Sequence, residues 1–271
     1  MAIRRHKAQL FVLLLALAIG LSAIGGEVDP KTFITHIDRL PNYLTDITPH
    51  LSLRNLPSDL ADWYWNLGHW FDLLVDTLLM AYLGTAFGVL GGFCLSFFAA
   101  ANLTPHGSVR LVARRFLEIC RTIPDLVFAL VFVAAFGLGA TPGILALSIH
   151  TSGALGKLFA EVVENIDMSG VDALKATGAT WTQTIRFGVL PHVAANFVSY
   201  ALLRFEINVR AAAVIGFVGA GGIGFDLIEA IRKFYYSDVS AILLMIIATV
   251  VLIDLGSERL RHALTKAERR R

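Results

Sequence analysis

The sequence predicts an all-α polytopic membrane protein with six transmembrane helices. Hydrophobic residues make up 56% of its 271 residues and charged residues only 16%, and the mean hydropathy is +0.66. Soluble domains contain about 25% charged residues, so this chain has too little polar surface to cover a water-soluble globule. Long uncharged stretches also occur, such as the 25 residues from Thr77 to Ala101. A helix of about 20 apolar residues can cross a bilayer.

The hydropathy pattern divides the apolar residues into six helices. Residues 126–156 contain no charged residue, which is too long for one span, and the sequence GLGATPG interrupts them. We therefore expect one helix to end there and another to begin. Pro124 should kink the earlier helix, with Arg121 and Asp125 paired one turn apart across the kink. The predicted spans are residues 9–25, 73–101, 114–138, 143–164, 188–215 and 238–256.

The distribution of charge predicts that both termini lie in the cytoplasm. Residues 26–72 carry seven acidic but only three basic residues, whereas cytoplasmic loops are enriched in Lys and Arg. This segment therefore belongs outside. The N-terminus also fits a removable signal peptide, an alternative that leaves the later topology unchanged. The basic residues that set the orientation are Arg4, Arg5, Lys7, Arg110, Arg114, Arg115, Arg259, Arg261, Lys266, Arg269, Arg270 and Arg271.

The sequence VIGFVGAGGIGFD, residues 214–226, contains the G-x-G-x-x-G pattern of dinucleotide-binding loops. Such a loop joins a strand to a helix in a soluble βαβ unit, whereas this one lies between two predicted spans. We interpret it as a membrane turn whose glycines break the fifth helix and allow close backbone approach. Non-helical backbone at that depth needs surrounding protein or a water-filled cavity. The loop is thus a candidate for the substrate passage, with simple turn packing as the alternative. Its glycines are Gly219, Gly221, Gly222 and Gly224.

Motifs that carry enzyme chemistry are missing from the sequence. It has no G-x-x-x-x-G-K-[ST] phosphate-binding loop, and GALGK at 153–157 has the wrong spacing. It has no G-x-S-x-G or H-E-x-x-H motif and no metal-ligand spacing. Cys94 and Cys120 lie in apolar stretches and predict no disulfide framework. We expect no catalytic residue, metal or cofactor in this chain, and no nucleic-acid partner.

Small residues recur every four positions in the second span, at Gly84, Gly88 and Gly92. This spacing places them on one helix face, where a second helix can approach closely. Packing within one chain and a contact at a pore or dimer interface both fit this pattern.

The segment MSGVDALKATGATWTQTIRFGVLP, residues 168–191, predicts two short helices on the cytoplasmic side. Ser169 and Asp172 have the spacing of a capping box, as do Thr180 and Gln183. A glycine between them, Gly178, suits the left-handed conformation that ends many helices. Isolated helices this short are unstable in water, so the pair must dock on another surface.

The same segment resembles the E-A-A-x-x-x-G-x9-I-x-L-P signature of permease subunits in ABC importers. The matching stretches are DALKATG and, nine residues later, GVLP. Asp replaces Glu, Leu replaces the second Ala, and Gly188 replaces Ile. Three further stretches resemble the phosphonate-type permeases: CRTIPDLVFALVFV (120–133), HTSGALGKLFAEVVENID (150–167) and SYALLRFEINVRAAAVIGFVGAGGIGF (199–225). The resemblance covers about residues 70–256. The residues that match the signature are Asp172, Ala173, Leu174, Gly178, Leu190 and Pro191.

This resemblance implies the architecture of a type I ABC importer permease of the inner membrane. Residues 1–70 would hold the N-terminal helix and a periplasmic segment, and residues 71–256 the permease core. Coupling helices at 168–187, including the matched residues, would contact the ATPase, and residues 257–271 would form a basic cytoplasmic tail. The implied partners are two ATPase subunits that bind ATP and Mg²⁺, a second permease subunit, identical or paralogous, a periplasmic binding protein and the lipid bilayer. The implied substrate is phosphonate or a related oxyanion such as phosphite, hypophosphite or a phosphate ester.

The fifth span carries charged residues, which are costly inside a membrane. Arg204 and Asn208 share one helix face, whereas Glu206 and Arg210 share another and can pair. A phosphorus oxyanion needs guanidinium donors, so Arg204 or Arg210 is a candidate to line its route. The alternative is structural pairing of these arginines with carboxylates on other helices. The candidate carboxylates are Glu118, Asp125 and Glu161.

The fourth span adds two polar features. Lys157 and Glu161 stand four residues apart and should pair on the helix surface. His150 lies in the middle of the predicted span, where it is either packed among other side chains or in contact with a ligand.

An ion-coupled secondary anion transporter is the alternative function, because such carriers also place broken helices near the middle of the bilayer. The capped cytoplasmic helix pair argues against it, since an ion-coupled carrier needs no docking site for an ATPase. An intramembrane enzyme has no supporting motif.

Overall fold

The computed structural model describes residues 2–26, 29–49, 52 and 54–268, and within these ranges all regular structure is helical. The chain forms two compact units, Met1–Pro49 and His50–Arg271. The first unit contains α1 (Ala2–Gly25), α2 (Pro30–Thr35) and α3 (Arg39–Ile47). Some residues used to predict orientation lie outside the described set: Glu27, Arg269, Arg270, Arg271, and the side chains of Arg4, Arg5 and Lys266.

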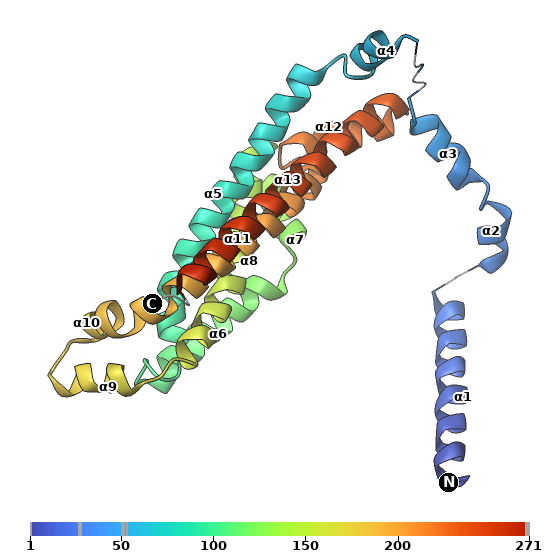
Figure 1. Ribbon diagram of the computed structural model, residues 1–271. Coiled ribbons are helices and arrows are strands. Elements are labelled where there is room, and N and C mark those ends of the chain that lie inside the picture. Colours follow the sequence, from blue (N-terminus) through green and yellow to red (C-terminus); the bar gives the residue numbers. More distant parts are fainter. Residues whose placement is uncertain (1, 27–28, 50–51, 53, 269–271) are drawn as a thin grey trace. The chain divides into compact units, whose positions relative to one another are not determined.

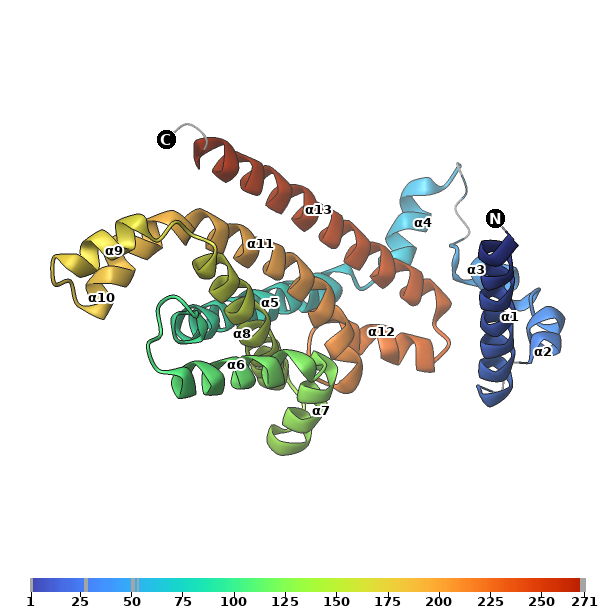
Figure 2. The ribbon, with the colours of Figure 1, turned by 90° about the horizontal axis from the view of Figure 1, so that it is seen from below.

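The second unit is a bundle with a helical projection at one end. Helices α9 and α10 project there, and the C-terminal end of α13 lies toward the same end (Figures 1 and 2). Helix α4 and the turn between α12 and α13 lie at the opposite end. The elements are α4 (Leu56–Trp63), α5 (Leu67–Ala99), α6 (Gly107–Thr122), α7 (Asp125–Phe136), α8 (Ala140–Glu164), α9 (Ser169–Ala176), α10 (Trp181–Gln183), the π-helix η1 (Thr184–Val189), α11 (Leu190–Ile215), the 3-10 helix η2 (Gly216–Val218), α12 (Ile223–Arg232) and α13 (Tyr236–Glu268).

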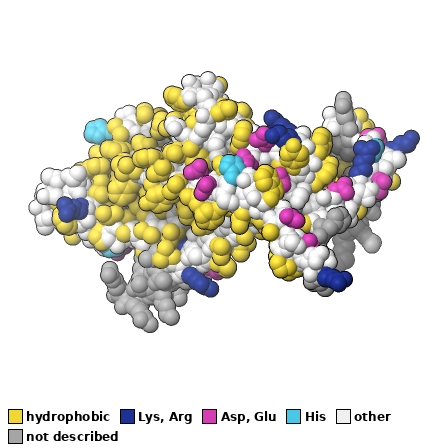
Figure 3. All heavy atoms as spheres, turned by 90° about the horizontal axis from the view of Figure 1, so that it is seen from above, with side chains coloured by type: hydrophobic (Ala, Val, Ile, Leu, Met, Phe, Trp, Pro, Cys, Tyr) yellow, Lys and Arg dark blue, Asp and Glu magenta, His cyan; other side chains and the backbone are white. Residues whose placement is uncertain are grey.

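The helices account for the predicted number of membrane spans. Four are long and apolar enough to cross a bilayer, and two bent helix pairs bring the number to six if each pair forms one span. Hydrophobic side chains form wide continuous areas on the face shown in Figure 3, as expected for a surface in contact with lipid tails. The four single helices are His6–Gly25, Leu67–Ala99, Ala140–Glu164 and Tyr236–Arg261.

The third predicted span is not one kinked helix but two helices, α6 and α7, bent by 85°. Pro124 lacks an N–H group and holds an extended conformation with φ −56° and ψ 142°, so the helix cannot continue through it. The predicted Arg121–Asp125 pair is also wrong: no ion pair joins them in the described part of the chain. Their four-residue spacing brings side chains together only on a continuous helix.

Helix α8 is packed between α5 and α6 at contacts that exclude larger side chains. A Cβ atom on Gly88 would lie 2.5 Å from the Thr151 Cβ, and one on Gly92 would lie 2.9 Å from the backbone nitrogen of Gly156. On the other side of α8, a Cβ on Gly153 would lie 2.6 Å from the Arg121 nitrogen. The glycine stripe of α5 therefore packs against α8 of the same chain, which decides between the two interpretations of that pattern.

A short helix between the fifth and sixth spans, α12, was not predicted. Its apolar residues Ile223 and Leu227 are buried in a cluster with Trp70 of α5 and Ile242 of α13. The spacing of those residues by four is a helical signal that the neighbouring glycines obscured in the sequence. The Trp63 indole N–H also donates to the Ser237 carbonyl at 3.1 Å, which links α4 to the start of α13.

The packing of α5 on α8 predicts opposite effects for two glycine substitutions in α5. Gly92→Ala places a methyl group against backbone, and such overpacking typically destabilises by about 1–3 kcal/mol. Gly68→Ala is the matched control, because a Cβ there has nothing within 4 Å and alanine favours a helix over glycine by about 1 kcal/mol. Thermal unfolding in detergent should give a lower midpoint for Gly92→Ala than for Gly68→Ala. The reverse order would contradict this packing.

Candidate functional site

The projecting segment begins with a helix cap that the sequence did not predict. Asp167 accepts hydrogen bonds from the Ser169 N–H at 3.0 Å and from the Ser169 hydroxyl at 2.9 Å. These bonds, the backbone bond first, lower the pKa of Asp167 below its ordinary value. The cap therefore forms wherever this carboxylate is ionised and is lost only as the pH falls through that lowered pKa. The predicted Ser169–Asp172 capping box is wrong, because Asp172 pairs instead with Lys175 at 3.1 Å.

Helix α9 ends at the predicted glycine. Gly178 has φ +83°, a left-handed conformation that only glycine adopts without strain. The Gly178 N–H bonds to the Lys175 carbonyl and the Ala179 N–H to the Leu174 carbonyl. These two bonds form a Schellman motif, which turns the chain sharply from α9 into α10.

The second predicted short helix is the start of a long one. Thr180 and Gln183 form a capping box with both of its hydrogen bonds, as predicted. From there α10, η1 and α11 run on without a break to Ile215, so the second helix of the predicted pair is not a separate short helix. Pro191 has no N–H to give to a carbonyl four residues back, and the preceding turns widen into a π-helix in which the Leu190 N–H bonds to the Ile185 carbonyl.

Side chains anchor the projecting segment to the bundle. Val171 of α9 is 1% exposed and belongs to a core cluster with Phe159 and Phe197. Gly188 is what allows this contact, since a Cβ there would lie 3.0 Å from the Leu174 Cδ1 and 3.4 Å from the Val171 Cγ2. The glycine that replaces the usual Ile at this signature position therefore leaves room for α9 to pack on η1.

A second anchor was missed in the sequence. The Trp181 ring stacks on Phe98 at 5.3 Å between centroids, and its indole N–H donates to the Leu103 carbonyl at 3.3 Å. The signal in the sequence was a tryptophan within a short polar segment. A tryptophan ring usually packs on apolar side chains while its N–H donates to an acceptor. Helix α10 is thereby fixed to the end of α5.

Polar bonds brace the same end of the bundle. Asn102 donates to the Val163 carbonyl at 2.8 Å, and the Ala101 N–H donates to the Glu164 carboxylate at 2.6 Å. Arg114 of α6 pairs with Glu164 and donates to the Ala99 carbonyl at 2.9 Å. The C-terminal ends of α5 and α8 are therefore linked to each other and to α6. The connection to α9 begins directly after these contacts.

The predicted coupling residues fall into two groups. Asp172, Ala173 and Gly178 are exposed on the projection, and Leu174 is partly buried where α9 meets η1. Leu190 and Pro191 lie at the base, where the π-helix passes into α11. The exposed group could contact another protein, while the basal group determines the path of the chain that carries it.

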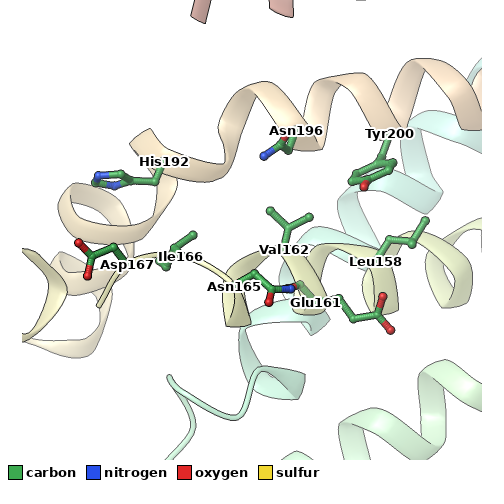
Figure 4. A pocket seen from close by; sticks show the side chains of 9 residues that line it. All are labelled: Leu158, Glu161, Val162, Asn165, Ile166, Asp167, His192, Asn196 and Tyr200. Atoms are coloured by element: carbon green, nitrogen blue, oxygen red, sulfur yellow. The ribbon is translucent and has the colours of Figure 1, made fainter. Parts of the chain in front are cut away.

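A groove of about 470 Å³ lies beside this segment, between the end of α8 and the start of α11 (Figure 4). His192, Asn196 and Tyr200 line it from α11, and the His192 Nδ1 lies 2.9 Å from the Gly188 carbonyl. Asp167, the residue that caps α9, lines the end of the groove near His192. The groove therefore adjoins the first turn of the projection.

Arg204 does not meet a carboxylate inside the bundle. Its Nη2 lies 2.7 Å from the His150 Nδ1, and its Nε donates to the Thr151 hydroxyl at 3.2 Å. Asn208, predicted beside it on the substrate route, is completely buried and donates to Thr85 at 2.8 Å and to Thr151 at 2.9 Å. In this conformation Asn208 holds three helices together and is not accessible to a substrate.

The other charged residues of the fifth span, and Lys157 and Glu161 of the fourth, are paired. Arg210 lies 3.7 Å from Glu206, as predicted, and 4.0 Å from Asp254 of α13. Glu206 also pairs with Arg261 at 3.2 Å. Lys157 and Glu161 form the predicted pair at 3.7 Å. The structure thus separates Arg210, which belongs to an ion-pair group between α11 and α13, from Arg204.

The glycine loop packs into the bundle as a close backbone contact. Gly219, Gly221 and Gly222 have φ between +77° and +85°. A Cβ on Gly224 would collide with the Ala213 carbonyl oxygen, and the Gly139 N–H donates to the Gly219 carbonyl at 3.0 Å. The Ile223 N–H donates to the Thr77 hydroxyl at 2.9 Å, which ties the loop to α5. The fifth helix breaks here, as predicted, and neighbouring helices surround the loop, but the chain does not turn back: α12 is bent by 47° from the helix before the loop.

A bundle of helices long and apolar enough to cross a bilayer, with a braced helical projection at one end, is the architecture of an integral membrane protein. The chain belongs to the family of binding-protein-dependent transport system inner membrane components, whose model matches residues 92–270. It is 46% identical over 192 residues to the phosphite transport system permease protein PtxC of Stutzerimonas stutzeri, which covers 71% of this chain and 70% of that protein. It is 41% identical over 191 residues to the phosphate-import permease protein PhnE of Mycolicibacterium smegmatis, covering 69% of this chain but only 36% of that longer protein.

Solved structures share the fold. The MetNI methionine ABC transporter, in inward-facing conformations, matches 72% of this chain and 95% of its own with a TM-score of 0.61 at 21% identity. The chain is therefore a multi-pass inner-membrane permease subunit of an ABC transporter, which works with a separate ATPase, a substrate-binding protein and a second permease subunit. This family replaces the ion-coupled carrier that the sequence left as an alternative.

The turn at Gly178 predicts a difference between two substitutions at one position. Valine cannot adopt the left-handed conformation without a cost of about 1–2 kcal/mol, whereas asparagine adopts it more readily. In the complex with its ATPase, Gly178→Val should lower ATP-driven uptake at least tenfold, and Gly178→Asn should retain most of it. Uptake in proteoliposomes, with membrane insertion checked by quantitative blotting, measures this. Normal uptake by Gly178→Val would contradict the role of the turn.

Proposed function

We propose that this chain is the permease subunit of an ATP-driven importer for a small phosphorus oxyanion. Relatives named for phosphite and phosphate transport support this substrate class, as does PhnE2 of Escherichia coli, named for a phosphonate transport system. PhnE2 is 52% identical over 118 residues, which cover 44% of this chain and 97% of that protein. Phosphonate, phosphite, hypophosphite and phosphate esters share the tetrahedral oxyanion that a guanidinium recognises.

The observation that carries the coupling role is the braced projection. An exposed helix turn that is fixed to α5, α8 and η1 can pass a displacement to the membrane helices without being deformed itself. We assign Asp172, Ala173, Leu174 and Gly178 to the surface that contacts the ATPase. Leu190 and Pro191 connect that surface to α11 through the π-helix. Closure of the ATPase would then move α11 together with the projection.

The assembly follows from the coupling role. We propose two ATPase subunits, which bind ATP and Mg²⁺, and two permease subunits, either identical or paralogous. The projection and the C-terminal end of α13 share one end of the second unit (Figure 1), and this end would face the cytoplasm. Helix α4 and the turn between α12 and α13 would face the periplasm, where a binding protein delivers the substrate.

Within the membrane we place the substrate route near Arg204 and the glycine loop. Arg204 has no carboxylate partner among the described residues, whereas Arg210 is paired and Asn208 is buried. The glycines Gly219, Gly221 and Gly222, which have positive φ, form with Gly224 the kind of close turn that lets a backbone line a passage.

The substrate assignment predicts which anions stimulate the assembled complex. With its ATPase and binding protein in proteoliposomes, phosphite, methylphosphonate or phosphate should stimulate ATP hydrolysis and be taken up. Sulfate, matched in size but different in charge and protonation, is the control. The permease subunit alone should show no nucleotide binding in titration calorimetry. Stimulation by methionine or glycine betaine but by no phosphorus oxyanion would contradict the proposed substrate class.

A further inference from the structure

A hollow of about 340 Å³ opens between the end of α6 and the middle of α8. Its lining is unusually cationic for a membrane helix pair. The lining residues are Arg121, His150, Ala154, Lys157, Leu158 and Glu161. Lys157 is neutralised by Glu161 at 3.7 Å, so Arg121 contributes the excess charge.

Arg121 has no counter-ion in the described part of the chain. Asp125 does not form an ion pair with it, because residues four apart meet only on a continuous helix and the chain bends by 85° at Pro124. A charged group within a membrane span is costly unless it has a partner, and such groups mark substrate or ion pathways. The described residues therefore leave room for an anion from elsewhere as the partner of Arg121.

Arg204 contacts His150 and places a second guanidinium near the hollow. Its Nη2 lies 2.7 Å from the His150 Nδ1. A guanidinium only donates hydrogen bonds, so Nδ1 must accept and the proton of neutral His150 must lie on Nε2. That Nε2 lies 3.2 Å from the Arg121 carbonyl, which has no helical partner because α6 ends before Pro124. One imidazole thus holds both the Arg204 side chain and the end of α6.

The local charge is positive after all neighbours are counted. Asp125 acts electrostatically on both Arg204 and His150, but its Oδ1 accepts the Leu126 N–H at 2.9 Å and it forms no ion pair. Arg121 and Arg204 therefore face a single carboxylate. Buried hydrogen bonds from Asn208 to Thr151 and from Thr151 to Arg204 fix the arrangement from behind.

We propose that this hollow is an oxyanion subsite on the permeation path, with Arg121 as the contact group and His150 as the positioning residue that orients Arg204 behind it. The proposal rests on the proposed function and specifies where the phosphorus oxyanion binds within the chain. A tetrahedral oxyanion accepts two parallel hydrogen bonds from one guanidinium, and the second cation would stabilise its charge without direct contact. From the sequence, Arg121 was expected to pair with Asp125, and His150 to be either packed among other side chains or in contact with a ligand.

The test compares Arg121→Gln with Arg115→Gln in the assembled complex. Arg115 lies on the same helix, is paired with Glu118 and does not line the hollow. The Arg115→Gln substitution therefore removes an equal charge outside the hollow. With saturating liganded binding protein, Arg121→Gln should lower phosphite uptake per ATP hydrolysed by about tenfold or more, the loss expected for one charge-assisted hydrogen bond. Arg115→Gln should stay within about twofold of the unmodified protein.

A second pair of variants tests whether the hydrogen-bond acceptor at the His150 Nδ1 position is needed. His150→Asn places an acceptor near the position of Nδ1 and should keep most of the phosphite uptake. His150→Gln has no acceptor at that position and should lose most of the uptake. In a background with Cys94→Ser and Cys120→Ala, phosphite should also slow thiol labelling of Ala154→Cys, and Arg121→Gln should abolish this protection.

The outcomes separate the subsite from the substrate class. If the unmodified complex transports no phosphorus oxyanion, the proposed function fails and the subsite fails with it. If it transports phosphite and Arg121→Gln does so equally well, the subsite alone is wrong. Loss of subunit assembly in Arg121→Gln, with unchanged labelling of Ala154→Cys by phosphite, would show that Arg121 pairs with another subunit and would also overturn the subsite.

Discussion

The close packing of α8 between α5 and α6 is the contact on which the rest of the structure depends. It is possible only because glycines bring backbones together, at Gly88 and Gly92 on one side and at Gly153 on the other. This contact sets Thr151 against Thr85 and Asn208, and it sets His150 against the end of α6. Without a hydrophobic driving force between helices in lipid, such packing and the buried hydrogen bonds stabilise the bundle.

The same helix connects the interior of the bundle to the helical projection. Its C-terminal residue Glu164 joins Arg114 and the Ala101 N–H, and the chain then passes through the Asp167 cap into α9. Trp181 and Val171 fix the projection to the rest of that end. A displacement of α9 therefore reaches α8 and α11 together, and Arg204 and His150 lie on these two helices. The proposed coupling surface and the proposed anion subsite are therefore connected through the same two helices, α8 and α11.

Much of this organisation could be predicted from the sequence, because apolar length and glycine punctuation are local signals. The six spans, the left-handed turn at Gly178 and the Thr180–Gln183 capping box follow from such signals. Features that depend on two competing local partners could not be predicted. Asp167 accepts the Ser169 N–H that Asp172 would accept in the predicted capping box, and Asp172 pairs with Lys175 instead.

Long-range contacts were the other source of error. The sequence showed that Arg204 lacks a partner on its own helix, but the partner, His150, lies 54 residues away. The bend at Pro124 was expected as a kink, but its angle is 85°, and α6 and α7 both contact α8, which the sequence does not show. The helix α12 was not predicted, because the glycines before it, which allow close packing in the structure, are also typical of turns in a sequence.

The central claim is that the projection and α11 move as one body when the ATPase closes. It is tested most directly by pulsed electron paramagnetic resonance on the assembled complex, with spin labels at Lys175→Cys and Val198→Cys in a background of Cys94→Ser and Cys120→Ala. The distance between the two labels in one chain should stay unchanged on ATP trapping, while the distance between Lys175→Cys labels of two permease subunits should change. A change within one chain, with no change between subunits, would contradict the account.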